Sequence, residues 1–322
     1  MNYYCTHSDI NYLAKGIALY RSIYEKDTNF KLFYLCTDDE SYKVLTKMGL
    51  PFVAPISLAN LEQMDAESSK ARNNPASQCG DAYSQFCWTL TPYFINWLLR
   101  NELPRKAQLL YCDAHLFGTS IKITLKKKMI YFYHSPQLIF DACAVYSVGI
   151  HTHQFESYNP DTNNVGEFNV GCVFFRNDID GALISDKWKN WLLNPKNEYY
   201  QKYGTCGDQK YLDLFIPLFG ENNVCVFDRG HNILHGAPWN FTRYQFHNNN
   251  HVRKFGEQSQ PLVFNHFSHF VLNQDGSWRS SDHGEWNQDG KPIEDYHPQL
   301  KTWYTNYAKE LYSNQQLINN DS

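Results

Sequence analysis

The chain has 322 residues, of which 43% are hydrophobic and 19% are charged, and its formal net charge is −4. This balance is typical of a globular protein with a sizeable core, and it excludes an intrinsically disordered chain. The weak negative charge, with Lys126–Lys128 as the only compact basic run, argues against a nucleic-acid partner. We expect these lysines to lie in solvent at a helix end, and peripheral contact with anionic lipid is a minor alternative.

Nine cysteines are scattered through the sequence without any C-x-x-C spacing. An odd number of unpaired cysteines argues against a disulfide framework and against a zinc knuckle. The first residues lack the charged and apolar regions of a signal peptide, and no apolar stretch is long enough to span a membrane. We therefore expect a cytoplasmic protein, with the inner face of the membrane as an alternative location.

Short apolar runs alternate with amphipathic segments over the first hundred residues, which is the pattern of β-α-β units. Strands are predicted at 3–6, 31–36 and 52–56, and helices at 12–24 and 37–47. Gly49 follows the second helix as its end signal. Parallel strands joined by helices form a sheet that is covered on both faces, and ligands bind outside the carboxyl ends of its strands.

Further elements follow along the chain. They are a polar surface loop at 67–80, a helix at 86–99, strands at 108–112, 168–175 and 262–264, and helices at 180–193 and 208–219. Residues 155–167, rich in Asn, Asp and Gly, predict a flexible loop or lid. Only the residues after about 313 are expected to form a disordered tail. One large α/β domain is the simplest organisation, with two domains as the alternative.

Two potential metal ligands, Asp113 and His115, directly follow the strand predicted at 108–112. A carboxylate with an imidazole suits Mn²⁺, and the end of a strand is where a ligand of this fold class binds. In isolation such a pair is more often a helix cap or part of a solvated loop. A third ligand is needed, and His266 and His269 follow another apolar strand, although at least one of them is expected to be structural.

Three other motifs have both a structural and a functional interpretation. Asp208 opens a predicted helix and is either its N-cap, a catalytic group or both. The Asn169–Gly171 segment of a strand indicates a closely approaching ligand or a bulge. The segment 235–240, H-G-A-P-W-N, predicts an aromatic-lined sugar pocket or a tight turn. Walker A, G-x-G-x-x-G, G-x-S-x-G and H-E-x-x-H motifs do not occur in the sequence.

Seven blocks, taken in order, resemble the bacterial nucleotide-diphospho-sugar transferases of the GT-A glycosyltransferase fold. They are T-H-S-D-I-N-Y-L-A-K-G-I-A-L (6–19), C-W-T-L-T-P-Y (87–93), L-Y-C-D-A-H-L-F (110–117), F-N-V-G-C-V-F-F-R-N-D (168–178), G-D-Q-K-Y-L-D (207–213), A-P-W-N (237–240) and V-F-N-H-F (263–267). The resemblance implies an α/β fold of GT-A type with a Rossmann-like central mixed sheet flanked by helices. This domain would span residues 1–275, and residues 276–322 would form a C-terminal helical extension and tail.

The resemblance also implies roles for individual residues. Asp113, His115 and His266 would hold Mn²⁺ or Mg²⁺, with His115 standing where the family usually has a second aspartate. Other transferases of this fold use such a D-x-H motif with Mn²⁺. Asp208 and Gln209 would lie near the anomeric carbon, where a carboxylate acts as a base or an amide stabilises developing charge. The implied donor-binding residues are Thr6, His7, Asp9, Asn11, Tyr12, Asn169, Gly171, Trp239 and Asn240.

The activity implied by the resemblance is metal-dependent transfer of a hexose-type sugar. The donor would be a nucleoside diphosphate sugar, with UDP as the expected nucleotide, and the acceptor a hydroxyl of a glycan or glycolipid, as in polysaccharide biosynthesis. A catalytically inactive protein of the same fold that binds nucleotide sugar or carbohydrate is the alternative. A sugar-phosphate nucleotidyltransferase ranks below both, because the segment after the first strand, 5–9, contains no glycine.

Overall fold

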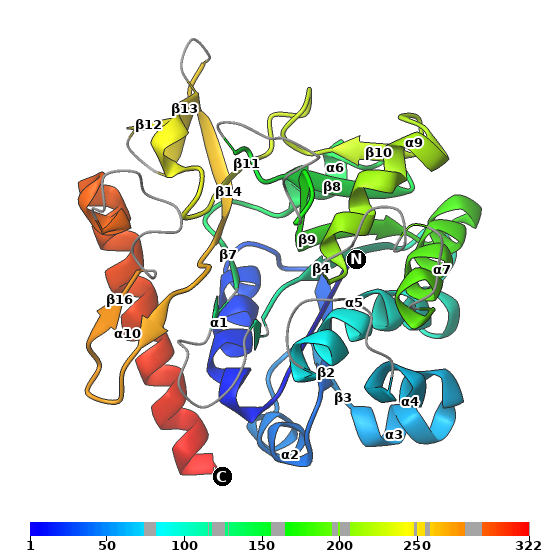
Figure 1. The fold of residues 1–322 in the computed structure, drawn as a ribbon. Helices are drawn as coiled ribbons and strands as arrows, with labels where there is room; N and C mark the ends of the chain where they lie inside the picture. Colours follow the sequence, from blue (N-terminus) through cyan, green and yellow to red (C-terminus); the bar gives the residue numbers. More distant parts are fainter. Residues whose placement is uncertain are drawn as a thin grey trace.

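A seven-stranded sheet forms the centre of the computed structural model, which describes residues 1–73, 82–114, 116–117, 126–127, 129–155, 165–194, 199, 207–247, 250–254, 258–280 and 292–321 (Figure 1). The strand order is β10 (Val224–Val226), β8 (Val148–Thr152), β9 (Phe168–Arg176), β4 (Gln108–Cys112), β1 (Asn2–Ser8), β2 (Phe30–Cys36) and β3 (Val53–Ser57). Strand β9 runs antiparallel to both of its neighbours, whereas the other pairs are parallel. The predicted central mixed sheet is therefore confirmed.

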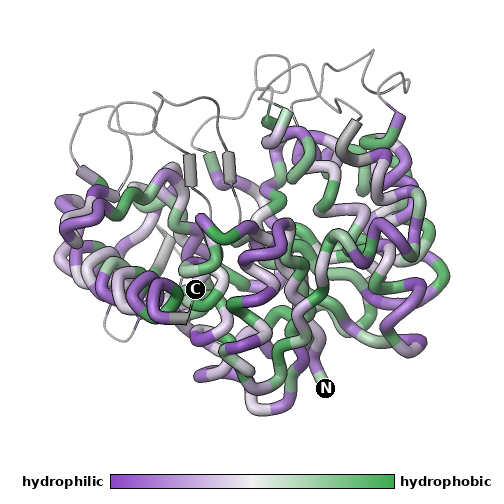
Figure 2. Tube along the Cα trace, turned by 90° about the horizontal axis from the view of Figure 1, so that it is seen from below, coloured by the Kyte–Doolittle hydropathy of each residue, from purple (hydrophilic) through white to green (hydrophobic). Residues whose placement is uncertain are grey.

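Two apolar clusters lie on opposite faces of this sheet, because successive side chains of a strand point to opposite faces. In β1, Tyr4 belongs to the first cluster and Cys5 to the second. The first cluster also contains residues of α1 (Leu13–Tyr24), α2 (Asp39–Met48), α6 (Gln137–Ala142) and α10 (Pro298–Asp321). The second contains residues of α3 (Leu58–Met64), α5 (Ala82–Asn101), α7 (Ile179–Leu193) and α9 (Phe215–Phe219). Helices therefore flank the sheet on both sides, and apolar segments gather between the layers (Figure 2).

Helix α2 shows how the sequence sets the bounds of an element. The Asp38 carboxylate accepts a hydrogen bond of 2.8 Å from the backbone N–H of Ser41 and so caps the first turn. At the other end, Gly49 takes a left-handed conformation with φ 56°, which ends the helix without the strain that a side chain would add. The predicted start and stop signals of this helix are both confirmed.

A second, smaller sheet carries one of the predicted site residues. Its strand order is β11 (Leu234–Gly236), β14 (Gln260–His266), β13 (His251–Lys254) and β12 (Tyr244–His247). A fifth strand, β7 (Ile130–Phe132), also pairs with β14. His266 is the last residue of β14 and pairs with Ile130. Two further sheets have two antiparallel strands each. They pair β5 (Leu116–Phe117) with β6 (Lys126–Lys127), and β15 (Val271–Leu272) with β16 (Trp278–Arg279). Short 3-10 helices lie at η1 (Ile10–Tyr12), η2 (Gln209–Leu214), η3 (Phe241–Arg243) and η4 (Ile293–Asp295).

Several local predictions were wrong. The first part of the supposed loop at 67–80 is helix α4 (Ala66–Asn73), and Lys126–Lys127 form strand β6 rather than a helix end. The helix predicted at 208–219 is a 3-10 helix in its first half and α-helix only in α9. The supposed tail continues α10 as far as Asp321, since Ile318 packs into the first apolar cluster. Residues 156–164 of the predicted lid lie outside the described residues.

Helix α10 packs along α1, although the two helices lie at opposite ends of the sequence (Figure 1). The Asn314 side chain donates a hydrogen bond of 3.0 Å to the backbone carbonyl of Ala14. None of the described helices is long and apolar enough to cross a membrane. The division of the chain at residue 275 stays a prediction.

Candidate active site

Asp113 follows the last residue of β4 and is fully buried. Its backbone N–H donates to the carbonyl of Gly171 on β9 at 2.8 Å, and its carboxylate Oδ1 accepts from the Tyr111 hydroxyl at 2.8 Å. The other carboxylate oxygen, Oδ2, lies 3.9 Å from Nε2 of His266. The structure therefore brings together two of the predicted metal ligands from two different sheets.

His266 lies directly against Gly171. A Cβ atom at position 171 would come within 2.8 Å of the ring carbon Cε1 of His266 and within 2.8 Å of Oδ1 of Asn169. A side chain at this position would therefore displace the imidazole or the amide, because contacts under about 3 Å are repulsive. The indole of Trp239 packs edge-on against the His266 ring, with ring centroids 5.4 Å apart. Gly171 thus has a packing role at this site.

The donor set fits a divalent metal in part. A buried carboxylate oxygen and an imidazole nitrogen 3.9 Å apart can reach one ion together, since each binds such a metal at about 2.0–2.2 Å. His115, the third predicted ligand, lies outside the described residues. Within the described ranges, no group of three or more His, Cys, Asp or Glu side chains is placed to hold a metal. His269 is buried and adopts a positive φ of 61° three residues after His266.

An amide network lies beside the Asp113–His266 pair. The side-chain N–H groups of Asn169 donate to Nε2 of His153 and to Oε1 of Gln209, each at 3.0 Å, and its Oδ1 accepts from the backbone N–H of Gly171 at 2.8 Å. Nδ1 of His153 lies 3.1 Å from the carbonyl of Glu167. These partners are all satisfied when His153 is neutral with its proton on Nδ1. The network fixes the orientation of both Asn169 and Gln209.

Gln209 is held on both sides of its amide group. Oε1 also accepts from the backbone N–H of Val170 at 3.3 Å, and Nε2 donates to the carbonyl of Val165 at 2.9 Å. The residue therefore connects β9 with the segment that precedes it, and it is 7% exposed. Its predicted catalytic role stays a prediction, whereas this positioning role is visible in the contacts.

Asp208 is almost fully buried at the start of η2. It occupies the N-cap position of η2, as predicted, but its side chain makes no capping hydrogen bond there. Its backbone carbonyl accepts from the Trp188 indole N–H at 3.1 Å, which anchors this end of η2 on α7. Burial holds the pKa of Tyr111 well above its usual value, and the negative charges of Asp113 and Asp208 raise it further. The Asp113 carboxylate accepts the hydrogen bond of this hydroxyl.

The predicted nucleoside-binding residues follow β1. Thr6 and His7 are fully buried at its end, and Nε2 of His7 lies 3.2 Å from the Thr91 hydroxyl. That hydroxyl lies 3.2 Å from the hydroxyl of Tyr111, so a line of polar groups leads from His7 to Asp113. His7 is thus connected with the predicted metal site.

Asp9 caps η1 through the backbone N–H of Tyr12, at 3.2 Å, and accepts 2.7 Å from the Tyr83 hydroxyl. Burial raises the pKa of the Asp9 carboxyl above its usual value, although hydrogen bonds from Tyr83 and Asn11 oppose this. Asn11 is exposed, whereas Tyr12 is buried under α1. Asp9 therefore has a structural function in addition to its predicted one.

The segment 237–240 forms a closed turn. Oδ1 of Asn240 accepts from the backbone N–H of Ala237 at 2.8 Å, and its Nδ2 lies 3.2 Å from Nε2 of His235. The Asn240 amide is therefore engaged within the turn. Trp239 projects from it between the rings of His153, at 5.5 Å, and His266. Of the two residues, Trp239 is the one in contact with the candidate site.

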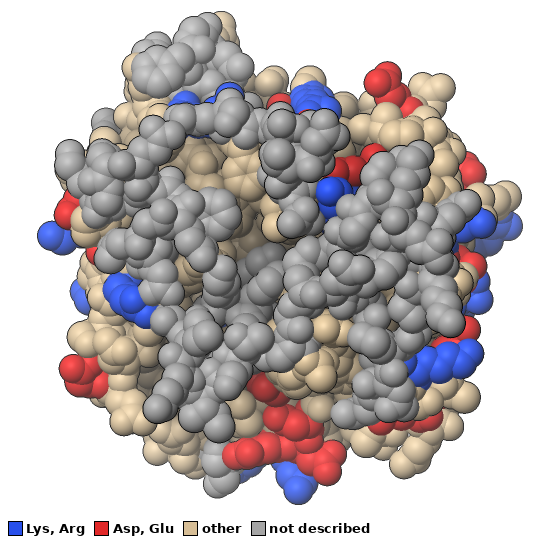
Figure 3. Space-filling model, viewed as in Figure 1, with Lys and Arg blue, Asp and Glu red and all other residues tan. Residues whose placement is uncertain are grey.

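His153 and Tyr111 were not singled out from the sequence, although both orient predicted site residues. The signal for His153 is the run H-T-H at 151–153, in which two buried imidazoles lie in and directly after the end of β8. Tyr111 lies in β4 two residues before Asp113, a spacing that lets both side chains extend to the same side of the extended chain. On the face shown in Figure 3, the described Lys and Arg side chains lie in small groups among Asp and Glu.

Comparisons with known proteins agree with this architecture. No protein-family model matches the sequence. The chain is 28% identical over 279 residues to the uncharacterized protein YfnF of Bacillus subtilis (strain 168), covering 84% of this chain and 82% of that protein. It is 26% identical over 266 residues to YfnD of the same organism, covering 81% and 75%.

Two solved structures have a similar fold. The galactosyltransferase LgtC, in complex with donor and acceptor sugar analogs, aligns with a TM-score of 0.55 at 14% identity, over 97% of this chain and 95% of that one. Mouse xyloside xylosyltransferase 1 in its apo form aligns with a TM-score of 0.52 at 15% identity, over 82% and 96%. The chain therefore has the predicted GT-A type fold, a central mixed sheet flanked by helices.

Proposed function

We propose that this protein is a metal-dependent glycosyltransferase that moves a hexose-type sugar from a nucleoside diphosphate donor, expected to be UDP-linked, to a hydroxyl of a glycan or glycolipid. The observation that carries the proposal is the approach of Asp113 to His266 at the carboxyl end of β4, with Oδ2 and Nε2 3.9 Å apart. This end of a central strand is where ligands bind in open α/β sheets. The fold similarity to a galactosyltransferase and a xylosyltransferase supports the reaction class.

The proposed metal is Mn²⁺ or Mg²⁺, held by Asp113, His266 and His115. Such an ion would supply charge neutralisation for the departing diphosphate. Asp113 is kept in place by Tyr111 and by the backbone of β9, so its carboxylate needs no rearrangement to bind. A preorganised ligand of this kind gives tighter binding, because less conformational freedom is lost.

The residues of the amide network would position the sugar. Asn169 and Gly171 lie between Gln209 and His266, so a donor bound at the metal would contact both. Gln209 is fixed by Asn169 and Val170, and an amide held in this way can stabilise charge at a developing oxocarbenium centre. Asp208, buried nearby, is the group for a base or a charge-stabilising role. Asp9, Asn11 and Tyr12 are proposed for the nucleoside.

Calorimetric titration tests this proposal. UDP and GDP are titrated into metal-stripped protein with and without Mn²⁺, and into the double variant Asp113→Ala with His115→Ala. The exposed acid Asp39, replaced by Ala, is the matched control. Metal-dependent binding that only the double variant loses supports the assignment and identifies the nucleotide. Tight binding that is indifferent to metal and to both substitutions contradicts it.

The alternative function is binding without transfer, and a second measurement separates the two. Donor hydrolysis with added Mn²⁺ is expected if the site is catalytic, because water can take the place of the acceptor hydroxyl as the nucleophile. Metal-dependent UDP binding without any hydrolysis or transfer across a panel of sugar donors would favour a carbohydrate- or nucleotide-sugar-binding protein.

A location in the cytoplasm or at the inner face of the membrane belongs to the same proposal.

A further inference from the structure

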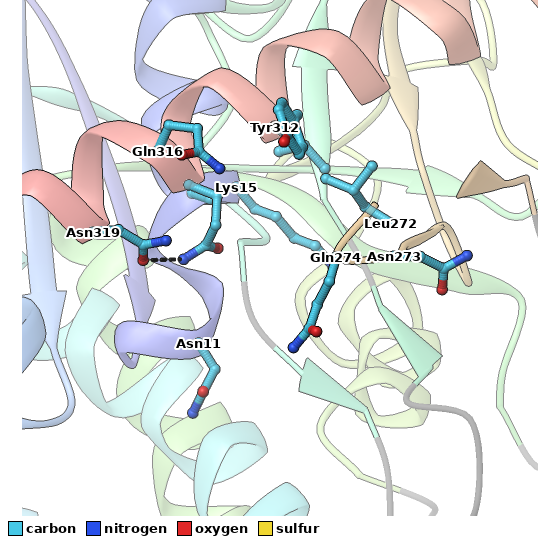
Figure 4. A pocket seen from close by; sticks show the side chains of 11 residues that line it. Asn11, Lys15, Leu272, Asn273, Gln274, Tyr312, Gln316 and Asn319 are labelled. Carbon is cyan, nitrogen blue, oxygen red and sulfur yellow. Dashed lines mark hydrogen bonds between the residues drawn. The ribbon is translucent and has the colours of Figure 1, made fainter. Parts of the chain in front are cut away.

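A polar groove of about 530 Å³ lies between α1, the β15–β16 hairpin and α10 (Figure 4). We call it the amide groove. It is lined by Asn11, Ala14, Lys15, Leu272, Asn273, Gln274, Leu311, Tyr312, Gln315, Gln316 and Asn319. Its volume falls within the range of 300–1,000 Å³ that is typical of small-ligand sites. The amide groove is therefore large enough for a ligand of several rings.

Carboxamides dominate the lining, with six Asn or Gln residues and no Asp or Glu among the lining residues. Each carboxamide offers an acceptor oxygen and two donor hydrogens, so it can bind a hydroxyl either way. Some of them are already oriented: Asn273 donates to Ser277 at 2.9 Å, and Gln315 donates to Asn319 at 3.2 Å. The side-chain amides of Gln274 and Gln316 make no hydrogen bond within the described part of the chain, so they can turn toward a ligand.

Lys15 lies at the base of the groove and is 6% exposed. Its side chain extends from α1 toward Gln274, and its ammonium lies 5.0 Å from the centre of the Tyr12 ring (Figure 4). Tyr312, which is 41% exposed, and Leu272 add apolar surface to the walls. Hydroxyl-binding groups thus surround apolar patches, and this is the combination that the polar edges and apolar faces of a sugar ring require.

Other ligand classes fit the groove less well. A nucleic acid would call for several cationic side chains, and Lys15 is the only one among the described lining residues. An amphipathic peptide helix would call for a mainly apolar surface, whereas amides prevail here. We propose that the amide groove is a carbohydrate-binding site that takes a hydroxyl-rich oligosaccharide. The groove shares Asn11 with the proposed nucleoside site and so adjoins it, but none of the groups around Asp113 is among its described lining residues, so glycan binding here requires neither sugar transfer nor the metal.

The test is binding of the full chain to an array of bacterial oligosaccharides, followed by calorimetry with the best-bound glycan. The variant carries Gln316→Ala and Asn319→Ala, and because both residues of α10 are exposed, the fold is expected to stay intact. Loss of two hydrogen bonds is expected to weaken glycan binding about ten-fold. Asn320→Ala, an exposed amide next to the groove lining, is the matched control and is expected to bind as the unchanged protein does.

Lys15→Gln, tested in the same way, separates the two possible contributions of the lysine. Equal loss for neutral and acidic glycans assigns it as a hydrogen-bond donor, and greater loss for acidic glycans assigns it as a cation. Either result supports the amide groove.

Two outcomes overturn the proposal: no glycan of the array binds, or binding survives both groove variants unchanged.

Titration of UDP with Mn²⁺ distinguishes a failure of this proposal from a failure of the proposed function. Unchanged UDP binding by the α10 variant with loss of glycan binding places the glycan in the amide groove. Retained glycan binding by the Asp113→Ala and His115→Ala double variant, with loss of UDP binding, shows that the two sites are distinct.

Discussion

A substitution at Gly171 is expected to destabilise the fold, which the sequence around this residue does not indicate. Gly171→Ala would place a methyl group 2.8 Å from the His266 ring, so we expect a loss of about 1–3 kcal/mol in the free energy of unfolding. Chemical denaturation measures this loss. Because the clash involves the imidazole, Gly171→Ala combined with His266→Ala should lose less than the sum of the two single variants. Strictly additive losses would contradict the contact.

The Tyr111 hydroxyl orients Asp113, and under the proposed metal assignment it acts on metal affinity. Tyr111→Phe removes the 2.8 Å hydrogen bond to Oδ1, and loss of such an outer partner typically weakens metal binding by about 10–100-fold. Titration with Mn²⁺ monitored by electron paramagnetic resonance measures the change. Tyr93→Phe removes a like hydroxyl-to-carboxylate bond, at 2.8 Å to Asp65 between α3 and α4, and should leave the Mn²⁺ affinity unchanged. Equal effects of the two variants would sink the assignment.

At the scale of single residues, the sequence predicted which side chains are chemically suited to a site, but not which of them contact one another in the folded chain. Asp113 and His266 were expected together, and the structure places them 3.9 Å apart. His153 was missed, because its role depends on Asn169 and Glu167, which reach it only through the pairing of β8 with β9. The bonds within the turn at Asn240 likewise depend on the conformation of His235. Such networks follow from tertiary structure and leave no pattern in a single sequence.

Helix α10 shows where the prediction of elements fails. Its last turns are rich in Asn and Gln, which suggested a tail, yet Ile318 is 1% exposed in the apolar cluster that covers α1. Tertiary packing overrides weak local propensity here. Strand β4, by contrast, was predicted with its observed bounds, because its apolar run is flanked by polar residues on both sides. Helix α4 was missed since its sequence, A-E-S-S-K-A-R-N, contains almost no apolar period.

Ile318→Ala tests the packing of α10. Removal of a buried Ile side chain is expected to lower the free energy of unfolding by about 2–5 kcal/mol. Leu317→Ala is the matched control: it removes a similar volume one residue away, where the side chain is 38% exposed, and should change stability by less than about 1 kcal/mol. Urea denaturation of both variants gives the comparison. A similar, small effect of both substitutions would restore the interpretation of this segment as a tail.

Glu310 makes the contact between α10 and its neighbours sensitive to pH. Burial raises its pKa from the ordinary 4.5 to about 7, although a hydrogen bond with Tyr131 and the charge of Arg21 oppose the shift. The folded chain therefore holds a proton that the unfolded chain has already released between these two values. The contribution of Glu310 to the free energy of unfolding is therefore fully retained below pH 4.5, where both states hold the proton. It is lost as the pH rises through 7.

Glu310→Gln removes this titration. We expect the variant to gain up to about 2 kcal/mol over the unchanged protein at pH 8 but nothing at pH 4.5, a figure that allows for partial exposure to solvent. Thermal unfolding across this pH range measures the difference. Glu40→Gln, at an exposed position of α2, controls for general charge effects. A constant difference between the Glu310 variant and the unchanged protein at every pH would contradict the buried proton.

At the scale of the whole molecule, the cysteines report on global unfolding. All seven free cysteines that the structure describes are buried, so a thiol reagent cannot reach them while the chain is folded. We expect at most two of the nine cysteines, Cys79 and Cys206, to react with a disulfide reagent in native buffer, and all nine in denaturant. Absorbance of the released thiolate counts them. Rapid reaction of more than two in native buffer would show that the layers open locally.

The overall architecture was the most predictable level. The β-α-β rhythm of the first hundred residues and the apolar strands predicted an α/β sheet covered on both faces, and the structure confirms it. The second sheet was predicted only at β14, since its other strands have only three or four residues and β12 and β13 are also polar. Chain order carries no direct information about which strands become neighbours when the pairing crosses long intervals.

The packing of α10 on α1 has a consequence for the order of folding. The hydrogen bond from Asn314 to Ala14 joins residues 300 positions apart, so the ribosome makes one partner long before the other. During synthesis the apolar side of α1 that α10 later covers has no permanent neighbour, and exposed surface of this kind is what chaperones bind. Completion of the first apolar cluster is thus a late event, and we expect the nascent chain to need protection until α10 has emerged.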